Sequence, residues 1–188
     1  MRMRGLFAVT MLGSALMFGA ASADEVAQAE LVRRIFLGGR VSMLVPRDSQ
    51  VFSVAEIRRS HPGSDLPDLV ITDRGRAISI TLKHTALPMK PGGLREVLDR
   101  LREGLPKHQP KARIIRMAMA NWGGRSFMLA FLERPAPSPQ GGRRIDNYTV
   151  GTVLRGGLLL IAFNSDVAKR PVWSAARDRM IRSIRVHE

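Results

Sequence analysis

The chain has 188 residues, a formal net charge of +14 and no cysteine. The lack of cysteine excludes disulfides, thiolate metal sites and thiol catalysis. The positive charge favours anionic partners such as acidic proteins or lipid headgroups. The sequence contains one tyrosine and no aromatic-rich basic strand of the kind that stacks bases. We therefore expect no nucleic-acid partner.

The first 23 residues have the features of a secretory signal peptide. Two arginines in the first four residues precede an apolar run over about 6–20, and the small triplet Ala21-Ser22-Ala23 follows. Charge, a short apolar run and small residues in this order predict cleavage after Ala23. The rival interpretation is an uncleaved anchor, but the run is shorter than the roughly 20 residues of a spanning helix. We expect a periplasmic protein that begins at Asp24.

Residues 24–188 are long enough for one domain with a full-sized core. Two apolar runs, 31–36 and 40–46, flank Leu37-Gly38-Gly39, which predicts a hairpin. A capping box, with Ser53 as the N-cap and Glu56 three residues later, predicts a short helix that ends before Pro62.

A second hairpin is predicted over 68–84, with its turn at 73–76. In the returning strand, alternation places Ile78, Ile80 and Leu82 on one face. Ser79, Thr81 and Lys83 occupy the other face. The period then changes from two residues to a helical one, in a stripe formed by Leu94, Val97, Leu98 and Leu101. We expect a helix packed on a sheet, ended by a left-handed cap at Gly104 with Leu105 folded back onto its last turn.

The remaining elements are mostly strands. A third hairpin runs over 113–133 with its turn at Asn121–Gly124, and a fourth over 145–164 around Arg155-Gly156-Gly157. Between them, the three prolines of the loop 134–144 exclude regular structure. Pro171 begins a last helix, predicted to bury Val172, Trp173, Ala176 and Met180 and to expose Asp178, Arg182 and Arg185.

No motif in the chain indicates catalysis or a cofactor. The glycine pairs form neither a dinucleotide fingerprint nor a P-loop, and a strand rather than a helix follows Gly123-Gly124. The histidines, His61, His84, His108 and His187, have no zinc spacing, and we interpret each as a surface or loop residue. Asp65, Asp68 and Asp73 could hold a hard cation, but turn and strand-entry roles are favoured. We predict no catalytic, cofactor-binding or metal-binding residues, and no enzyme activity.

The order of these elements resembles the PsbP/Mog/DcrB-like family, over about residues 39–186. The segments that carry the resemblance are GGRVSMLVP, NWGGRSFMLAF and GGLLLIAFN. It implies an α+β fold: one α/β/α sandwich around an antiparallel sheet built from hairpins, with a long central helix and a C-terminal helix. It also implies a mostly non-enzymatic role. Members include extrinsic photosystem subunits, Ran-binding proteins, periplasmic proteins needed for phage uptake and secretion-effector chaperones, and bacterial members are largely of unknown function.

Three functions stay open at this stage. The first is an exported, periplasmic, non-catalytic binding or accessory protein that holds a protein partner by its sheet edge, its loops or a basic face. The second is a peripheral factor that binds the anionic membrane surface through the arginines over 177–185. The third is a hydrolase with an unrecognised site.

Overall fold

The structure is a computed structural model, and it describes residues 30–61, 65–75, 78–86, 88–90, 92–136 and 142–187. The predicted signal peptide, 1–23, lies outside the described residues, as do residues 137–141 of the predicted loop. Cleavage after Ala23 and a single domain over 24–188 therefore stay predictions. None of the described helices is long and apolar enough to cross a membrane.

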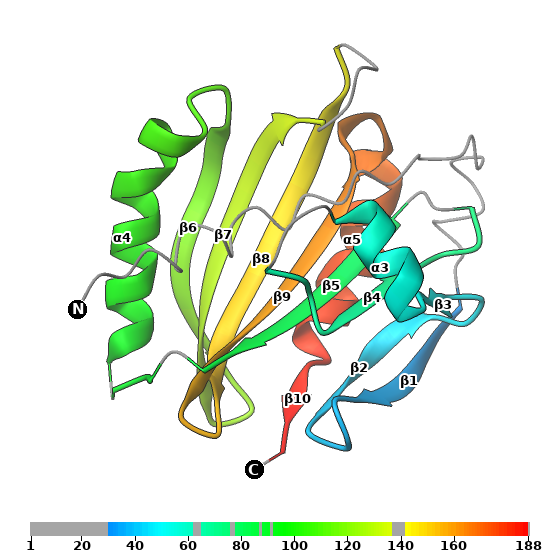
Figure 1. Ribbon diagram of the computed structural model, residues 1–188, viewed down its shortest axis with the longest axis horizontal. Coiled ribbons are helices and arrows are strands. Elements are labelled where there is room, and N and C mark those ends of the chain that lie inside the picture. The colour runs from blue at the N-terminus through cyan, green and yellow to red at the C-terminus, as the bar shows by residue number, and fades with distance from the viewer. Residues whose placement is uncertain are drawn as a thin grey trace.

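The described chain forms two antiparallel sheets (Figure 1). The large sheet has seven strands in the order β3-β4-β5-β9-β8-β7-β6. Its strands are β3 (Gln50–Val51), β4 (Leu69–Thr72), β5 (Ile78–Thr85), β6 (Arg113–Trp122), β7 (Arg125–Pro135), β8 (Arg144–Leu154) and β9 (Gly157–Asp166). The small sheet contains β1 (Leu31–Phe36), β2 (Val41–Pro46) and β10 (Arg185–Val186), in the order β1-β2-β10.

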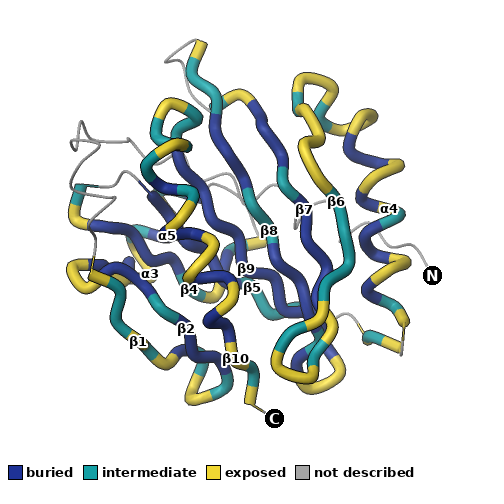
Figure 2. The backbone as a smooth tube through the Cα atoms, turned by 180° about the vertical axis from the view of Figure 1, so that it is seen from behind, coloured by how far each residue is buried: buried dark blue, intermediate teal, exposed yellow. Residues whose placement is uncertain are grey.

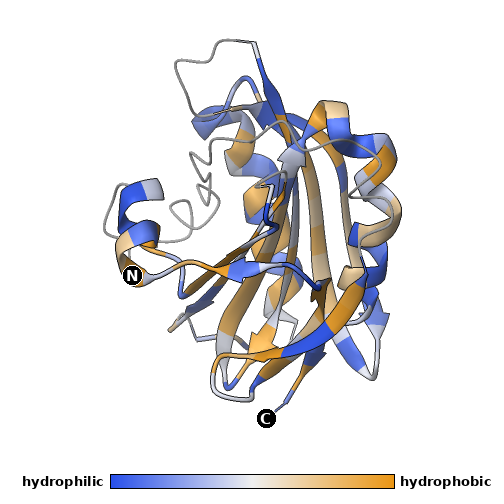
Figure 3. Ribbon diagram, turned by 90° about the vertical axis from the view of Figure 1, so that its right-hand side faces the viewer, coloured by the Kyte–Doolittle hydropathy of each residue, from blue (hydrophilic) through white to orange (hydrophobic). Residues whose placement is uncertain are grey.

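Helices cover both faces of the large sheet. Helices α3 (Val54–Ser60) and α4 (Gly93–His108) lie on one face, here called the α4 face. Helix α5 (Arg170–Arg182), preceded by the 3-10 turn η1 (Val167–Lys169), and the small sheet lie on the other, here called the α5 face. The side view in Figure 3 shows the mainly apolar strands edge-on between these layers. The predicted α+β sandwich around an antiparallel sheet is confirmed.

The two faces bury separate apolar clusters. On the α5 face, Trp173 and Met180 of α5 and Met43 of β2 pack against the odd-numbered residues of β7 and β9. On the α4 face, the predicted stripe of α4 packs against the even-numbered residues of the same strands, and Leu98 is 2% exposed. Helix α4 thus packs on the sheet as predicted, and Trp173, Ala176 and Met180 of the last helix are buried as predicted.

All four predicted hairpins are present, and the turn at Gly123-Gly124 has the backbone that its sequence indicates. Trp122 pairs with Arg125. The two glycines between them have φ of 57° and 73°. Positive φ at both central residues is typical of a type I′ hairpin turn. The glycines therefore join two strands, as predicted, and form no phosphate loop.

Several boundaries were predicted wrongly. Helix α4 continues past Gly104 to His108, because Leu105 is buried in the α4 cluster and extends the apolar stripe by one turn. Strand β7 runs into the predicted loop as far as Pro135, since a proline at the last position of a strand removes no ladder bond that the sheet requires. The turn between β8 and β9 consists of Arg155 and Gly156, both with positive φ, whereas Gly157 begins β9.

The C-terminal segment and the first hairpin also depart from expectation. Arg185 lies in β10, which pairs with β2, rather than on the outside of the last helix. Val172 is half-buried rather than buried. The first hairpin forms the small sheet with β10 instead of joining the large one.

Candidate functional site: an arginine–aromatic face

Part of the α5 face is not covered by α5. In Figure 2, which views this face, α5 and the small sheet lie over one half of the large sheet, and β6, β7 and β8 continue beside them. Arg116, Phe131 and Tyr148 are direct register partners on these three strands, so their side chains share this face. Arg116 is exposed, and both rings are half-buried.

Two arginines of α5 extend over these rings. The guanidinium carbon of Arg177 lies 5.4 Å from the ring centroid of Phe131 and 4.8 Å from that of Tyr148. Arg170 lies 5.5 Å from the Phe131 centroid, and the two rings stack at 5.2 Å. These distances are within the range of cation–π attraction. We call Arg113, Arg116, Trp122, Phe131, Tyr148, Arg170 and Arg177 together the arginine–aromatic face.

The face ends in a cluster of ion pairs, two residues from Phe131 along β7 and two residues from Tyr148 along β8. Glu133 and Asp146 are register partners on β7 and β8. Arg170 bonds both, with Nη2 2.9 Å from Glu133 Oε2 and Nε 2.7 Å from Asp146 Oδ2. Arg113 Nη2 lies 2.8 Å from Glu133 Oε2, and Arg144 Nε lies 2.5 Å from Glu133 Oε1. Three guanidinium groups thus surround two carboxylates, which leaves a net positive charge.

The ion pairs of this cluster hold Glu133 and Arg170 in their charged forms near neutral pH. The hydrogen bonds from Arg170 and Arg113 lower the pKa of Glu133 from 4.5 to about 2. The same contacts, chiefly with Asp146, raise the pKa of Arg170 above its ordinary value. Glu133 therefore stays anionic and Arg170 stays cationic near neutral pH, which makes the carboxylate a weak base and the guanidinium a weak acid. The excess of guanidinium groups can attract and orient an anionic group.

Trp122 forms the opposite end of the face. Its ring stacks on Phe127 with centroids 3.6 Å apart and planes 1° from parallel. The indole Nε1 is buried and has no hydrogen-bond partner.

The histidines serve local roles in separate places. His61 is the C-cap of α3, in a bend as the loop interpretation expects, but it is buried, which lowers its pKa. His84 lies within β5, where Nε2 is 2.9 Å from the Leu154 carbonyl oxygen. His108 ends α4, and His187 Nε2 lies 3.3 Å from Ser42 Oγ.

The three aspartates make local contacts at the turn and the strand entry of the second hairpin. Asp73 Oδ1 accepts the Ile78 amide in the β4–β5 turn, Asp68 Oδ2 accepts the His84 amide, and Asp65 pairs with Lys83 at 3.1 Å. Across the described residues, no three His, Asp or Glu side chains converge as metal ligands would.

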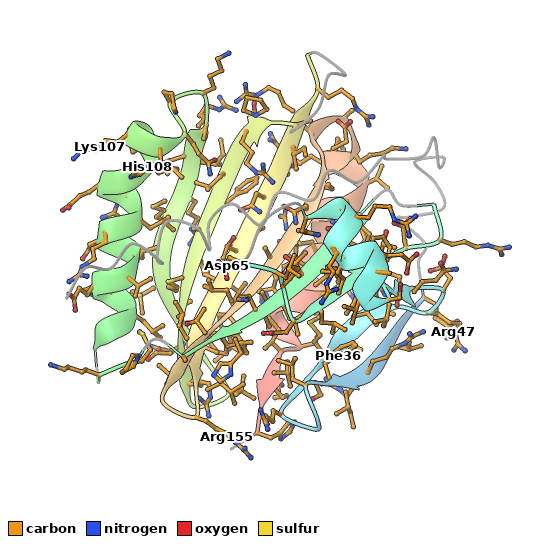
Figure 4. All side chains as sticks on the ribbon, in the orientation of Figure 1. Phe36, Arg47, Asp65, Lys107, His108 and Arg155 are labelled. Carbon is orange, nitrogen blue, oxygen red and sulfur yellow. The ribbon has the colours of Figure 1, made fainter. Side chains whose placement is uncertain are left out.

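The arginines over 177–185 are not all at the surface. Arg177 is only 8% exposed, whereas Arg182 and Arg185 are exposed. Figure 4 shows Arg47, Lys107 and Arg155 on widely separated edges of the molecule. This arrangement does not support the membrane-surface alternative, because that reading depends on the arginines over 177–185 acting together.

Similar proteins are found by comparison of structures and not by comparison of sequences. The sequence matches no protein-family profile and no curated protein. The fold is similar to the solution structure of cyanobacterial PsbP (CyanoP) from Synechocystis sp. PCC 6803, with a TM-score of 0.61 and 15% identity, over 89% of this chain and 99% of that one. It is also similar to the Ran-binding protein Mog1p of Saccharomyces cerevisiae, with a TM-score of 0.55 and 13% identity, over 85% and 96% of the two chains. A third similar structure is LpqN, involved in cell envelope biogenesis of Mycobacterium tuberculosis, with a TM-score of 0.52 and 16% identity over 90% and 99%.

Nearly the whole length of each of these three structures aligns with this chain. One of them, Mog1p, is described as a Ran-binding protein. The resemblance seen in the sequence is thereby confirmed for the fold. The chain has the PsbP/Mog1-like fold.

Proposed function

We propose that this protein is an exported, periplasmic, non-catalytic binding protein whose arginine–aromatic face holds an acidic segment of a protein partner. The observation that carries the proposal is the register row Arg116–Phe131–Tyr148, in which Arg116 is exposed and both rings are half-buried beneath Arg177 of α5. Aromatic and arginine side chains are enriched at the centres of protein interfaces.

The face is a better docking surface than the edges of the sheet. At one edge, the strand β3 has only two residues. At the other edge, the register of β6 shifts between Ile114 and Arg116, and arginines flank this irregularity. Short strands, bulges and charges are the features by which proteins prevent edge pairing. The side chains of the face, not the backbone of the edge, therefore make the contact.

The net charge of the face determines the kind of partner. Three guanidinium groups share the carboxylates of Glu133 and Asp146, and Arg116 has no ion pair among the described residues. An acidic segment would neutralise this excess of positive charge, and its association rate would be higher at low salt. The Ran-binding neighbour Mog1p supports a protein partner in general terms.

The test compares two matched charge reversals in the mature protein, residues 24–188. Arg116→Glu changes the centre of the face, and Arg58→Glu changes an exposed arginine on α3, on the other side of the sheet. Each protein is used to capture partners from a periplasmic extract, with bound proteins quantified by mass spectrometry at low and high salt. We expect wild type and Arg58→Glu to retain the same acidic protein and Arg116→Glu to lose it. Equal retention by both variants would exclude this face as the interface.

The proposed export is tested separately, by the mass of the exported protein. The mass of the protein recovered from the periplasm should correspond to a chain that begins at Asp24. An intact Met1, or a protein confined to the cytoplasm, would contradict the proposed location without affecting the interface.

A further inference from the structure

Arg134, near the end of β7, carries a buried charge without a partner. The side chain lies on the α4 face and is 8% exposed. Its Nε and Nη2 atoms are buried and bond to nothing, and no ion pair of Arg134 is found in the described part of the chain. Burial lowers the pKa of Arg134 to about 10, so the group is still cationic at neutral pH. A buried, unpaired cation strongly destabilises a fold unless an anion reaches it.

The two unpartnered nitrogens are the ones that bind carboxylates elsewhere in this protein. Arg143 donates from Nε and Nη2 to Asp166 Oδ2 at 2.9 and 2.6 Å. Arg177 uses the same pair of nitrogens for Asp178 Oδ1, at 3.1 and 3.0 Å. These two parallel N–H groups match the spacing of oxygens in a carboxylate or phosphate. Arg134 presents the same edge with no oxygen on it.

Nearby carboxylates of the described chain are already engaged. Glu133 and Asp146 project to the α5 face, where they bind other arginines. Asp166 shares the α4 face and the register row of Arg134, through Ile145 between them. Its Oδ2 holds Arg143, and its Oδ1 accepts the Ala168 amide.

A second unpartnered donor lies on the same face. Thr149 Oγ1 donates to Asn147 Oδ1 at 3.0 Å, and Asn147 Nδ2 donates to Asn164 Oδ1 at 2.6 Å. This chain of hydrogen bonds ends at Asn164 Nδ2, which is buried and has no acceptor. Thr81 Oγ1, on the next strand, is also buried and unpartnered. In the register, Asn164 lies two strands across and two residues along from Arg134, and Thr81 lies three strands across and four residues along, beyond the reach of a small anion held by Arg134.

We propose that the α4 face binds a small oxyanion, a carboxylate or phosphate group, through Nε and Nη2 of Arg134. We call this donor pair the oxyanion site. The site lies on the opposite face of the sheet from the arginine–aromatic face, so it does not depend on the proposed protein partner. It explains why a charge is kept where burial alone would disfavour it.

The test measures thermal unfolding of the mature protein with acetate or inorganic phosphate, each against chloride at equal ionic strength. We expect one of the two anions to raise the Tm of wild type in a saturable way, and the comparison of the two identifies the class of anion. Arg134→Met removes the donor pair and should abolish the shift. Arg95→Met, an exposed arginine on α4, is the matched control and should keep it.

Two further measurements separate binding from a structural role. Without added anion, Arg134→Met should melt at or above wild type, because it removes an unpaired buried charge. Arg134→Lys keeps the charge but lacks the parallel N–H pair, and should weaken anion binding at least about ten-fold. If Arg134→Met does not fold, the Arg134→Lys titration decides the question. The proposal is overturned if neither anion acts beyond chloride, or if the Tm shift is the same in wild type and in Arg134→Lys.

Discussion

Removing the negative charge of Glu133 should destabilise the protein in a pH-dependent way. The pKa of this carboxyl falls from 4.5 to about 2 in the folded state, chiefly through Arg170 and Arg113. Such a difference corresponds to about 3 kcal/mol, since a factor of ten in a protonation constant is worth about 1.4 kcal/mol. The Glu133 side chain is 10% exposed, but Arg113 is 63% exposed, so solvent weakens part of this energy. We expect Glu133→Gln to lower the free energy of unfolding by about 2 to 3 kcal/mol at pH 7.

The sign of the pH dependence follows from the direction of the pKa change. A carboxyl with a lowered pKa in the folded state stabilises that state fully above its unfolded pKa of 4.5. This stabilisation is lost as the pH falls from about 4.5 towards about 2. The difference in unfolding free energy between wild type and Glu133→Gln should therefore shrink to about half between pH 7 and pH 3.

Urea unfolding of both proteins at pH 7 and pH 3 measures this difference directly. The matched control is Glu96→Gln, which removes an exposed carboxylate paired with Arg100 on α4. That change should cost about 0.5 kcal/mol or less at either pH. A cost for Glu133→Gln that equals the control, or that does not change with pH, would refute the account of the ion cluster given above.

Two further substitutions test the packing and the turn on which the fold depends. Leu98→Ala should lower the free energy of unfolding by about 2 to 5 kcal/mol in urea, because Leu98 is fully packed between α4 and the sheet; a cost near zero would mean that α4 is not docked there. Gly124→Val should cost about 1 to 3 kcal/mol, measured as a Tm several degrees lower, because φ is 73° at this position while a new Cβ would meet no atom within 4 Å. Unchanged melting, or stabilisation of wild type alone by nucleotide, would contradict the hairpin interpretation.

The sequence predicts the hairpins well because their signals are local. Alternation identifies the faces of β5 and β7, and glycine pairs mark the turns between strands. The alternation in β5 was nevertheless incomplete as a guide to burial. Ser79 and Thr81 face away from the main core, as predicted, yet both are fully buried. Polarity reports the face of a strand, but it does not report whether another layer covers that face.

Elements that depend on distant contacts could not be predicted. Strand β10 exists because the last residues pair with β2, about 140 residues away along the chain. The end of α4 was misplaced because Gly104 looks like a helix cap when its neighbour Leu105 is not known to reach the core. Local propensity is overridden wherever such burial is available.

The candidate sites were hidden for the same reason. Arg170 looks like the residue before a helix proline, and only the register of β7 with β8 brings Glu133 and Asp146 within its reach. The sequence predicts a loop at Arg134, because Pro135 follows it. If β7 is extended by two residues, the alternation that buries Ala130 and Leu132 on the α4 face also buries Arg134 there. That is the one sequence signal that could have revealed it.

The two proposed sites meet at adjacent residues of β7 but remain chemically separate. Consecutive side chains of a strand point to opposite faces, so Glu133 belongs to the ion cluster on the α5 face and Arg134 to the α4 face. Glu133 is bonded by three arginines, whereas Arg134 has no counter-charge among the described residues. A chain under selection for stability alone would place an apolar residue at position 134. The unpaired arginine therefore requires an explanation in function, and because the sheet separates the two faces, failure of the Arg116→Glu experiment would not bear on it.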